Sequence, residues 1–265
     1  LGVFQVEYGA TAEYGLFSAT TSLTSLTLDA LSAGANYHFR VLSKDSLNNE
    51  AASADNVFTT SAQAQNVVIS EIQISGAAAT DEFVELYNPT NSAISLAGWR
   101  LTKKSATGST TNNLLTTFPE KIIPAYGYFL VTHPSGYDGA ALPDAVYSTG
   151  AYLADNNTVI LYSDDGQTVV DMLGFGSAVN NEMQSAVNPA ANYSLERKAN
   201  ATSTDALLSS GGHKWLGNGY DINDNSQDFV LQPGPSPQNS LMLTEPRSSV
   251  PNIMVDSNWP TWQRD

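Results

Sequence analysis

Residues 67–90 read VVISEIQISGAAATDEFVELYNPT, and this stretch gives the clearest indication of the fold. Two runs rich in Val, Ile, Phe and Leu flank a segment of small residues, and the second run ends in an Asn-Pro turn. Short apolar runs bounded by turn residues are typical of β-strands. A sandwich core is expected from the large side chains on both sides of that turn: Phe83, Val84, Leu86, Tyr87, Trp99 and Leu101.

More strand-like segments follow along the chain, at 94–103, 121–134, 158–176 and 193–199. Within the third of these, Asp165-Gly166 separates TVILYS from QTVVDML, and this dipeptide favours a tight hairpin turn. The polar stretches at 103–116, 134–150, 176–191 and 198–220 are rich in Ser, Asn, Gly and Ala, so we expect surface loops there.

The first 60 residues also contain short strand patterns, at 4–9, 22–31, 36–45 and 56–60. Val6 and Tyr8 alternate with more polar neighbours, as in a strand that buries one face. A buried face needs a second sheet to cover it. We therefore expect a second sandwich before the first one.

The N-terminal segment resembles the second half of a fibronectin type III domain, through VEYG at 6–9, LSAGANYHFRV at 31–41 and FTT at 58–60. The resemblance implies that Leu31 and Tyr37 form a tyrosine corner. It also implies that residues 1–60 supply roughly the last five of seven strands. The first two strands are missing from this segment.

Residues 67 to about 240 resemble the lamin tail domain, an immunoglobulin-like sandwich. The motifs that carry the resemblance are VVISEI, DEFVELYNPT, ISLAGWRL, YSLER, DINDNSQDF and PGPSPQN. The predicted fold class is all-β, with two immunoglobulin-like β-sandwiches of which the N-terminal one is incomplete within a single chain. The predicted domains are 1–62, 63–240 and a C-terminal tail, 241–265.

The tail offers candidates for the missing strands, because VPNIMV and WPTWQRD resemble the first and second strands of a fibronectin type III domain. Burying one Trp and three aliphatic side chains gives on the order of 6–12 kcal/mol before ordering costs. Three arrangements stay open: the chain is a repeat cut from an array, the tail completes the next subunit, or it folds back on its own head. The predicted assembly interface contains Val6, Tyr8, Ile253, Val255, Trp259 and Trp262.

The charge and composition of the chain limit the kinds of molecule that it is expected to bind. The formal charge of −15 repels nucleic acid and anionic membranes, and no apolar run is long enough to span a bilayer. There is no cysteine, which excludes disulfides and thiolate chemistry. We expect an extracellular or cell-surface structural subunit that assembles with copies of itself, head to tail by strand complementation, into a filament or surface array. The alternative is a non-catalytic adhesion or polysaccharide-binding module excised from a larger secreted enzyme.

No catalytic residues are predicted. His38, His133 and His213 are far apart in sequence, and no base with an orienting partner is evident. Carboxylates recur at Glu71, Asp81, Glu82 and Glu85. Paired acids could hydrolyse glycosides, but these acids accompany the lamin-tail-like motifs, so a structural role is favoured.

Calcium is the only cofactor that the sequence suggests. The run DINDNSQD at 221–228 offers Asp221, Asn223, Asn225 and Asp228 as oxygen ligands. It lacks the glycine and the terminal Glu of an EF-hand loop, and Asp and Asn also favour turns for local reasons. Three Asn-x-Ser/Thr sequences mark glycosylation candidates at Asn156, Asn192 and Asn200.

Overall fold

The computed structural model describes residues 2–23, 25–28, 31, 35–60, 64, 66–119, 121–163, 168–242 and 252–254. The chain divides into two compact units, Leu1–Ser61 with Ser248–Asp265 (unit 1), and Ala62–Arg247 (unit 2). The described elements are nearly all strands, which confirms the predicted all-β class. The described residues contain no helix long and apolar enough to cross a bilayer.

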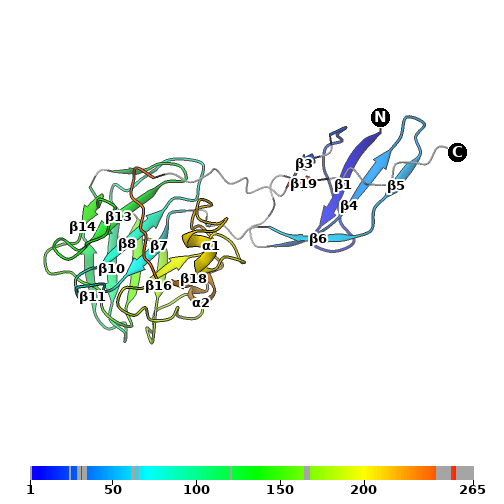
Figure 1. Ribbon diagram of the computed structural model, residues 1–265. Coiled ribbons are helices and arrows are strands. Elements are labelled where there is room, and N and C mark those ends of the chain that lie inside the picture. The colour runs from blue at the N-terminus through cyan, green and yellow to red at the C-terminus, as the bar shows by residue number, and fades with distance from the viewer. Residues whose placement is uncertain are drawn as a thin grey trace. The chain divides into compact units, whose positions relative to one another are not determined.

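Unit 1 contains a five-stranded antiparallel sheet and a separate two-stranded one (Figure 1). The larger sheet has the order β2-β1-β4-β5, and β6 also pairs with β4. Its strands are β1 (Val3–Gly9), β2 (Leu16–Phe17), β4 (Asn36–Lys44), β5 (Glu50–Ala52) and β6 (Asn56–Thr59). The smaller sheet pairs β3 (Ser25–Thr27) with β19 (Asn252–Met254). Residues from both ends of the chain therefore form one unit.

The described core of unit 1 is small. It centres on Val6, Leu28 and Val41, and the apolar side chains around it are only partly buried. Tyr37 is buried, and its ring stacks on Phe58 at a centroid distance of 5.7 Å. The predicted alternation in β1 holds in part: Val6 is buried between the partly exposed Gln5 and Glu7, but Tyr8 is only partly buried and Gly9 is buried.

Unit 2 is a sandwich with two main sheets. A six-stranded sheet has the order β14-β13-β8-β7-β17-β18, and it faces a four-stranded sheet with the order β11-β10-β15-β16 (Figure 1). The first sheet contains β7 (Val68–Gln73), β8 (Phe83–Tyr87), β13 (Tyr128–Thr132), β14 (Ala145–Val146), β17 (Ser194–Arg197) and β18 (Phe229–Gln232). The second contains β10 (Arg100–Lys104), β11 (Thr111–Leu115), β15 (Thr158–Ser163) and β16 (Thr168–Gly174). The remaining elements are the pair β9 (Ile94–Ser95) and β12 (Ile122–Ile123), and helices α1 (Asp205–Ser209) and α2 (Asn225–Asp228).

The core of unit 2 lies between these sheets and includes Val84, Leu86, Trp99 and Leu101, as the sequence predicts. Tyr87 belongs to a second cluster, with Val68 and Tyr128. Alternate residues of a strand point to opposite faces, so both faces of β8 are buried. The predicted hairpin is confirmed by the antiparallel pairing of β15 with β16, while Asp165-Gly166 itself lies outside the described residues.

Three of the four predicted loops contain regular structure. The stretch 103–116 includes β11, 134–150 includes β14, and 198–220 includes α1. β11 is an edge strand whose first three residues are exposed, so its polar sequence is compatible with pairing. In α1, the Thr204 side chain accepts the Leu207 N–H. This cap stabilises the helix although the sequence around it is polar.

Candidate functional site

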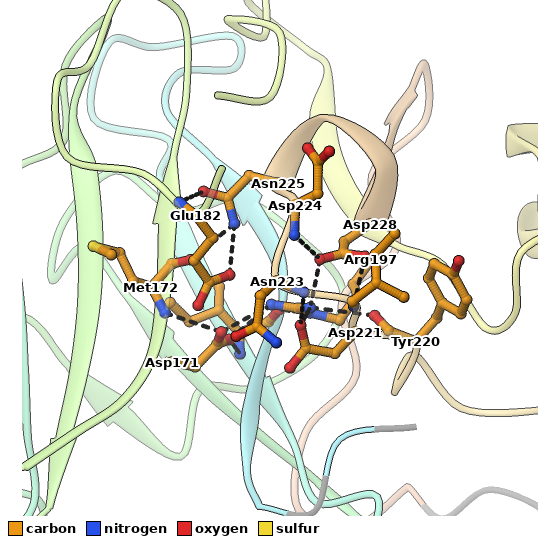
Figure 2. Close-up of polar contacts among 12 residues, drawn as sticks. Asp171, Met172, Glu182, Arg197, Tyr220, Asp221, Asn223, Asp224, Asn225 and Asp228 are labelled. Carbon is orange, nitrogen blue, oxygen red and sulfur yellow. Dashed lines mark hydrogen bonds and ion pairs between the residues drawn. The ribbon is translucent and has the colours of Figure 1, made fainter. Parts of the chain in front are cut away.

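A cluster of polar side chains surrounds Arg197 (Figure 2). Arg197 lies on β17, and its guanidinium donates to both carboxylate oxygens of Asp171 on β16, at 3.1 and 2.8 Å. Both side chains are almost completely buried. The pair therefore joins the two main sheets of unit 2 through their core.

A β-bulge in β7 provides the main-chain partners of this pair. The register between β7 and β8 shifts between Ile69 and Glu71, and the pairing of β7 with β17 stops at Glu71. Asp171 accepts the Ile69 N–H at 2.6 Å, and Arg197 donates to the Ile69 carbonyl at 2.8 Å. Since buried main-chain groups need partners, the ion pair and the bulge stabilise each other.

Three more carboxylates lie around Arg197. Asp221 and Asp228 are 3.4 and 3.8 Å from its Nη1, and carboxylate oxygens of Glu182, Asp221 and Asp228 lie within 4.8 Å of one another. Burial raises the pKa of Glu182 to about 8 and that of Asp228 to about 6. Arg197 is thus surrounded by more acidic side chains than one positive charge can balance. The raised pKa values favour the protonated, neutral forms of Glu182 and Asp228.

The predicted calcium ligands are only partly brought together. Asp221 and Asp228 share the cluster, joined by Glu182, which the sequence reading missed because it lies far from the 221–228 run. The Asn225 side-chain oxygen instead accepts the N–H groups of Gly174 and Glu182. Asn223 is exposed, with a positive φ of 59°. Arg197 already places a positive charge among these carboxylates, which disfavours the binding of a second cation.

Local hydrogen bonds account for the shape of the 221–228 run. Asp224 caps α2 by accepting the Ser226 N–H, and Asp228 accepts the N–H groups of Ile222 and Asp224. These are the turn and cap roles that Asp favours.

A second acidic group lies on the outer face of the six-stranded sheet. Glu85, Glu71 and Glu196 occupy directly opposite positions on β8, β7 and β17. Their described hydrogen-bond partners are neutral: Ser70, Ser194, Asn218, Gln232 and main-chain N–H groups. Burial, with the nearby charge of Glu196, raises the pKa of Glu85 to about 8. Burial and the charges of Glu196 and Glu85 raise the pKa of Glu71 well above its usual value.

The proline-rich segment 233–240 supplies two of those main-chain donors. The N–H of Gln238 donates to Glu85, and the N–H of Ser236 donates to Glu71. Pro235 and Pro237 alternate with these residues and have no N–H. Within 235–238, Ser236 and Gln238 are therefore the two residues that have an N–H group, and both groups donate to glutamates of the sheet.

The remaining predicted carboxylates are also satisfied inside the fold. Glu82 is buried and accepts the Leu153 N–H at 2.7 Å. Asp81 is buried and accepts the Asp138 N–H at 3.3 Å. These contacts hold loops against the sheet, in line with the structural role that the sequence favours.

The three histidines each contact a different residue in the described structure. His38 contacts Asp55 at 2.8 Å on the surface of unit 1, and His133 Nδ1 accepts the Ser135 N–H. His213 lies 3.0 Å from the Ser203 hydroxyl, but that oxygen already accepts the N–H groups of Ala199 and Asn200. Ser203 thus closes a turn, which is a structural role.

Of the glycosylation candidates, Asn192 has an exposed side chain. The Asn156 oxygen accepts the Ser177 N–H, and the Asn200 oxygen accepts the Thr202 N–H and hydroxyl.

Of the predicted assembly residues, Val6 is buried in the core of unit 1 and Tyr8 packs against it. Ile253 lies on β19, directly opposite Leu26 of β3. The segment read as a first strand thus pairs with β3 in the same chain. Val255, Trp259 and Trp262 lie outside the described residues.

Comparisons with known proteins support one of the two resemblances. Residues 60–177 match the family model of the lamin tail domain. That match begins after the N-terminal strands, so the fibronectin type III resemblance stays a prediction. Among solved structures, a DUF4876 family protein from Bacteroides thetaiotaomicron is similar, with a TM-score of 0.44 and 12% identity over 88% of this chain and 91% of that one. The search of curated proteins gives no match.

Proposed function

We propose that this chain is an extracellular, non-catalytic structural subunit whose C-terminal segment completes unit 1, and that copies assemble by exchanging this segment. The antiparallel pairing of β19 with β3 carries the proposal. It places Asn252, Ile253 and Met254 opposite Thr27, Leu26 and Ser25, respectively. Main-chain pairing of this kind is how a donated strand adds to a sheet.

Unit 1 has apolar surface for such an assembly. In its described part, β3 pairs with no strand except β19, and the core is small. Leu16 and Phe17, on the edge strand β2, are each at least half exposed. An open edge with exposed apolar side chains favours pairing with another chain.

The same pairing can form within one chain or between two. When the tail of one copy pairs with β3 of the next, the contact joins two different surfaces and need not close, so it propagates as a filament. Dilution favours the closed monomer and concentration favours exchange, because only exchange depends on a second molecule.

The absence of cysteine makes a direct test available. One preparation carries Leu26→Cys and a second carries Ile253→Cys, and the two are mixed under oxidising conditions. Exchange brings these positions opposite each other in different chains, so a mixed disulfide-linked dimer is expected. Ser25→Cys and Met254→Cys repeat the test at the neighbouring residue pair. Two pairs are used because successive pairs in an antiparallel ladder differ in spacing, and a disulfide forms only over a narrow range of distances.

Glu13→Cys, an exposed position of unit 1, mixed with Ile253→Cys is the control for random collision. Electron microscopy of the concentrated, unmodified protein gives an independent readout. Cross-linking no greater than in the control, together with single particles at every concentration, would contradict assembly. Efficient cross-linking within a chain that carries both Leu26→Cys and Ile253→Cys would then identify a closed monomer.

A further inference from the structure

Unit 2 contains a polar cavity with a volume of about 330 Å³ at the edge of the four-stranded sheet. One side is formed by β10 and the edge strand β11, and the other by the loop at 149–152. The lining residues are Lys103, Asn112, Asn113, Leu114, Thr149, Gly150, Ala151 and Tyr152. This volume is at the lower end of the range for sites that hold small ligands.

Lys103 is the charged group of this cavity. It follows Leu101 by two positions on β10, so both side chains point to the core side of the sheet. The residue is only 8% exposed, and its ammonium lies 3.9 Å from the centre of the Tyr152 ring. In the described part of the chain, no acceptor lies within hydrogen-bond distance of Nζ, and no carboxylate forms an ion pair with it.

This arrangement leaves an ammonium with unused donors at a cavity wall. Burial lowers the pKa of Lys103, and the charge of Glu82 opposes that effect. An ammonium has three donors, and those of Lys103 have no protein acceptor in the described residues. A ligand that brings an anionic oxygen into the cavity would accept a charge-assisted hydrogen bond from them.

Tyr152 adds an aromatic surface. It is 55% exposed although the Lys103 ammonium covers part of its ring. An exposed ring next to polar groups can pack against the C–H face of a sugar while its hydroxyl stays in water. Asn112, Asn113 and Thr149 supply amide and hydroxyl groups for hydrogen bonds to a hydroxylated ligand.

The loop that carries Tyr152 is held in place from both sides. The Leu153 N–H donates to Glu82 at 2.7 Å, and the Ala151 N–H donates to the Ser148 carbonyl at 2.9 Å. Ser148 in turn donates its N–H to the Leu114 carbonyl on β11 at 2.7 Å. The cavity is therefore preformed by bonds to both sheets, which reduces the ordering cost of binding.

We propose that this cavity binds a uronic acid residue of a glycan chain, with Lys103 pairing with the carboxylate and Tyr152 stacking on the ring. The proposal is independent of the assembly proposed above. One ammonium matches the one carboxylate of a uronic acid residue, whereas a heavily sulfated chain, with several charges on each sugar, would be repelled more strongly by the net charge of −15. A neutral sugar would supply no carboxylate to accept the donors of Lys103. The cavity lies at an exposed edge of the sheet, so the neighbouring sugars of a glycan chain can extend beyond it.

Binding of tri-galacturonate and tri-mannuronate to the full chain, measured by calorimetry, tests the proposal, with maltotriose as the neutral sugar. Lys103→Met should weaken binding of the acidic sugar by roughly 10- to 100-fold, because it removes a charge-assisted hydrogen bond. Tyr152→Ala should weaken it by about threefold or more. Melting curves show whether each variant is folded.

The chain contains matched controls for both variants. Lys104→Met removes the same charge from the next residue of β10, which does not line the cavity. Trp215→Ala removes another half-exposed aromatic ring that also lies beside a lysine, at 5.1 Å from Lys214 Nζ. Binding lost in the cavity variants and kept in the controls would support the site.

Three results would overturn it: no binding of either acidic trisaccharide, equal binding of maltotriose, or equal losses in the cavity and control variants. If Lys103→Met does not fold, the site is tested by comparing sugar binding of Tyr152→Ala with that of Trp215→Ala, because both of these side chains are exposed. Since these measurements do not involve the C-terminal segment, their failure leaves the assembly proposal unaffected.

Discussion

Arg197 and Asp171 form a two-oxygen ion pair across the core of unit 2, with oxygen distances of 3.1 and 2.8 Å from one Nη. Asp171 also accepts the main-chain N–H of Ile69, and Arg197 donates to the Ile69 carbonyl, at the position where the pairing of β7 is interrupted. One interaction therefore connects β7, β16 and β17. The stability of unit 2 should depend on it more than on any surface charge pair.

Arg197→Met should destabilise unit 2 by about 3–5 kcal/mol, because it leaves the buried Asp171 charge without its partner. Urea unfolding measures the change. The double variant Arg197→Met with Asp171→Leu should recover part of the loss, since it also removes the Asp171 charge that the single variant leaves buried. Arg40→Met removes the more exposed pair with Glu7 in unit 1 and should cost about 1 kcal/mol or less. Similar costs for the two single variants would refute the dependence on burial.

Unit 2 should become less stable as the pH rises from about 4.5 towards 8. Burial raises the pKa values of Glu85 and Glu182 to about 8 in the folded protein, so the folded state binds more protons than the unfolded state across this interval. Stability is therefore fully present below the unfolded pKa values and is lost as the pH rises through the folded ones. Each group contributes a slope of up to about 1.4 kcal/mol per pH unit.

Glu85→Gln should reduce this slope, because the amide cannot ionise. Denaturant unfolding at several pH values measures it, and Glu13→Gln, which changes an exposed side chain of unit 1, is the control for net charge. A stability that rises with pH over this interval, or an unchanged slope in Glu85→Gln, would show that the buried glutamates do not behave in this way.

Gln238→Pro should destabilise unit 2 by about 1–3 kcal/mol, because it removes the N–H that Glu85 accepts and leaves a buried carboxylate short of a donor. Gly234→Ala, in the same segment, should change stability by at most about 0.5 kcal/mol, because an added Cβ meets open space there. Thermal unfolding compares the two. Equal effects would mean that the segment is held by something other than its contacts with the glutamates.

Calcium should leave the unfolding midpoint of unit 2 unchanged, because Arg197 already lies among the carboxylates that would bind it. A bound ion at 100 times its Kd would add about 2.7 kcal/mol of stability. Titration with calcium, with magnesium as the comparison, distinguishes these outcomes. A large stabilisation by calcium that Asp221→Asn removes would establish the predicted metal site instead.

The sequence alone determined the all-β class, the core of unit 2 and the hairpin of β15 and β16, because period-2 apolar patterns and turn residues are local signals. It also singled out the tail as a source of strands, and Ile253 does lie opposite Leu26. It missed β11 and α1, whose polar sequences are stabilised by an edge position and by a side-chain cap.

The contacts between residues far apart in sequence became visible only in the folded chain. Asp171 and Arg197 are 26 positions apart, and Gln238 and Glu85 are 153 apart, so no local pattern predicts either contact. The structure also shows which strand the tail segment pairs with, since Ile253 lies opposite Leu26 of β3. Strand patterns depend on neighbours in sequence, whereas the pairing of buried charges depends on how two sheets pack, and that packing is fixed by the whole core at once.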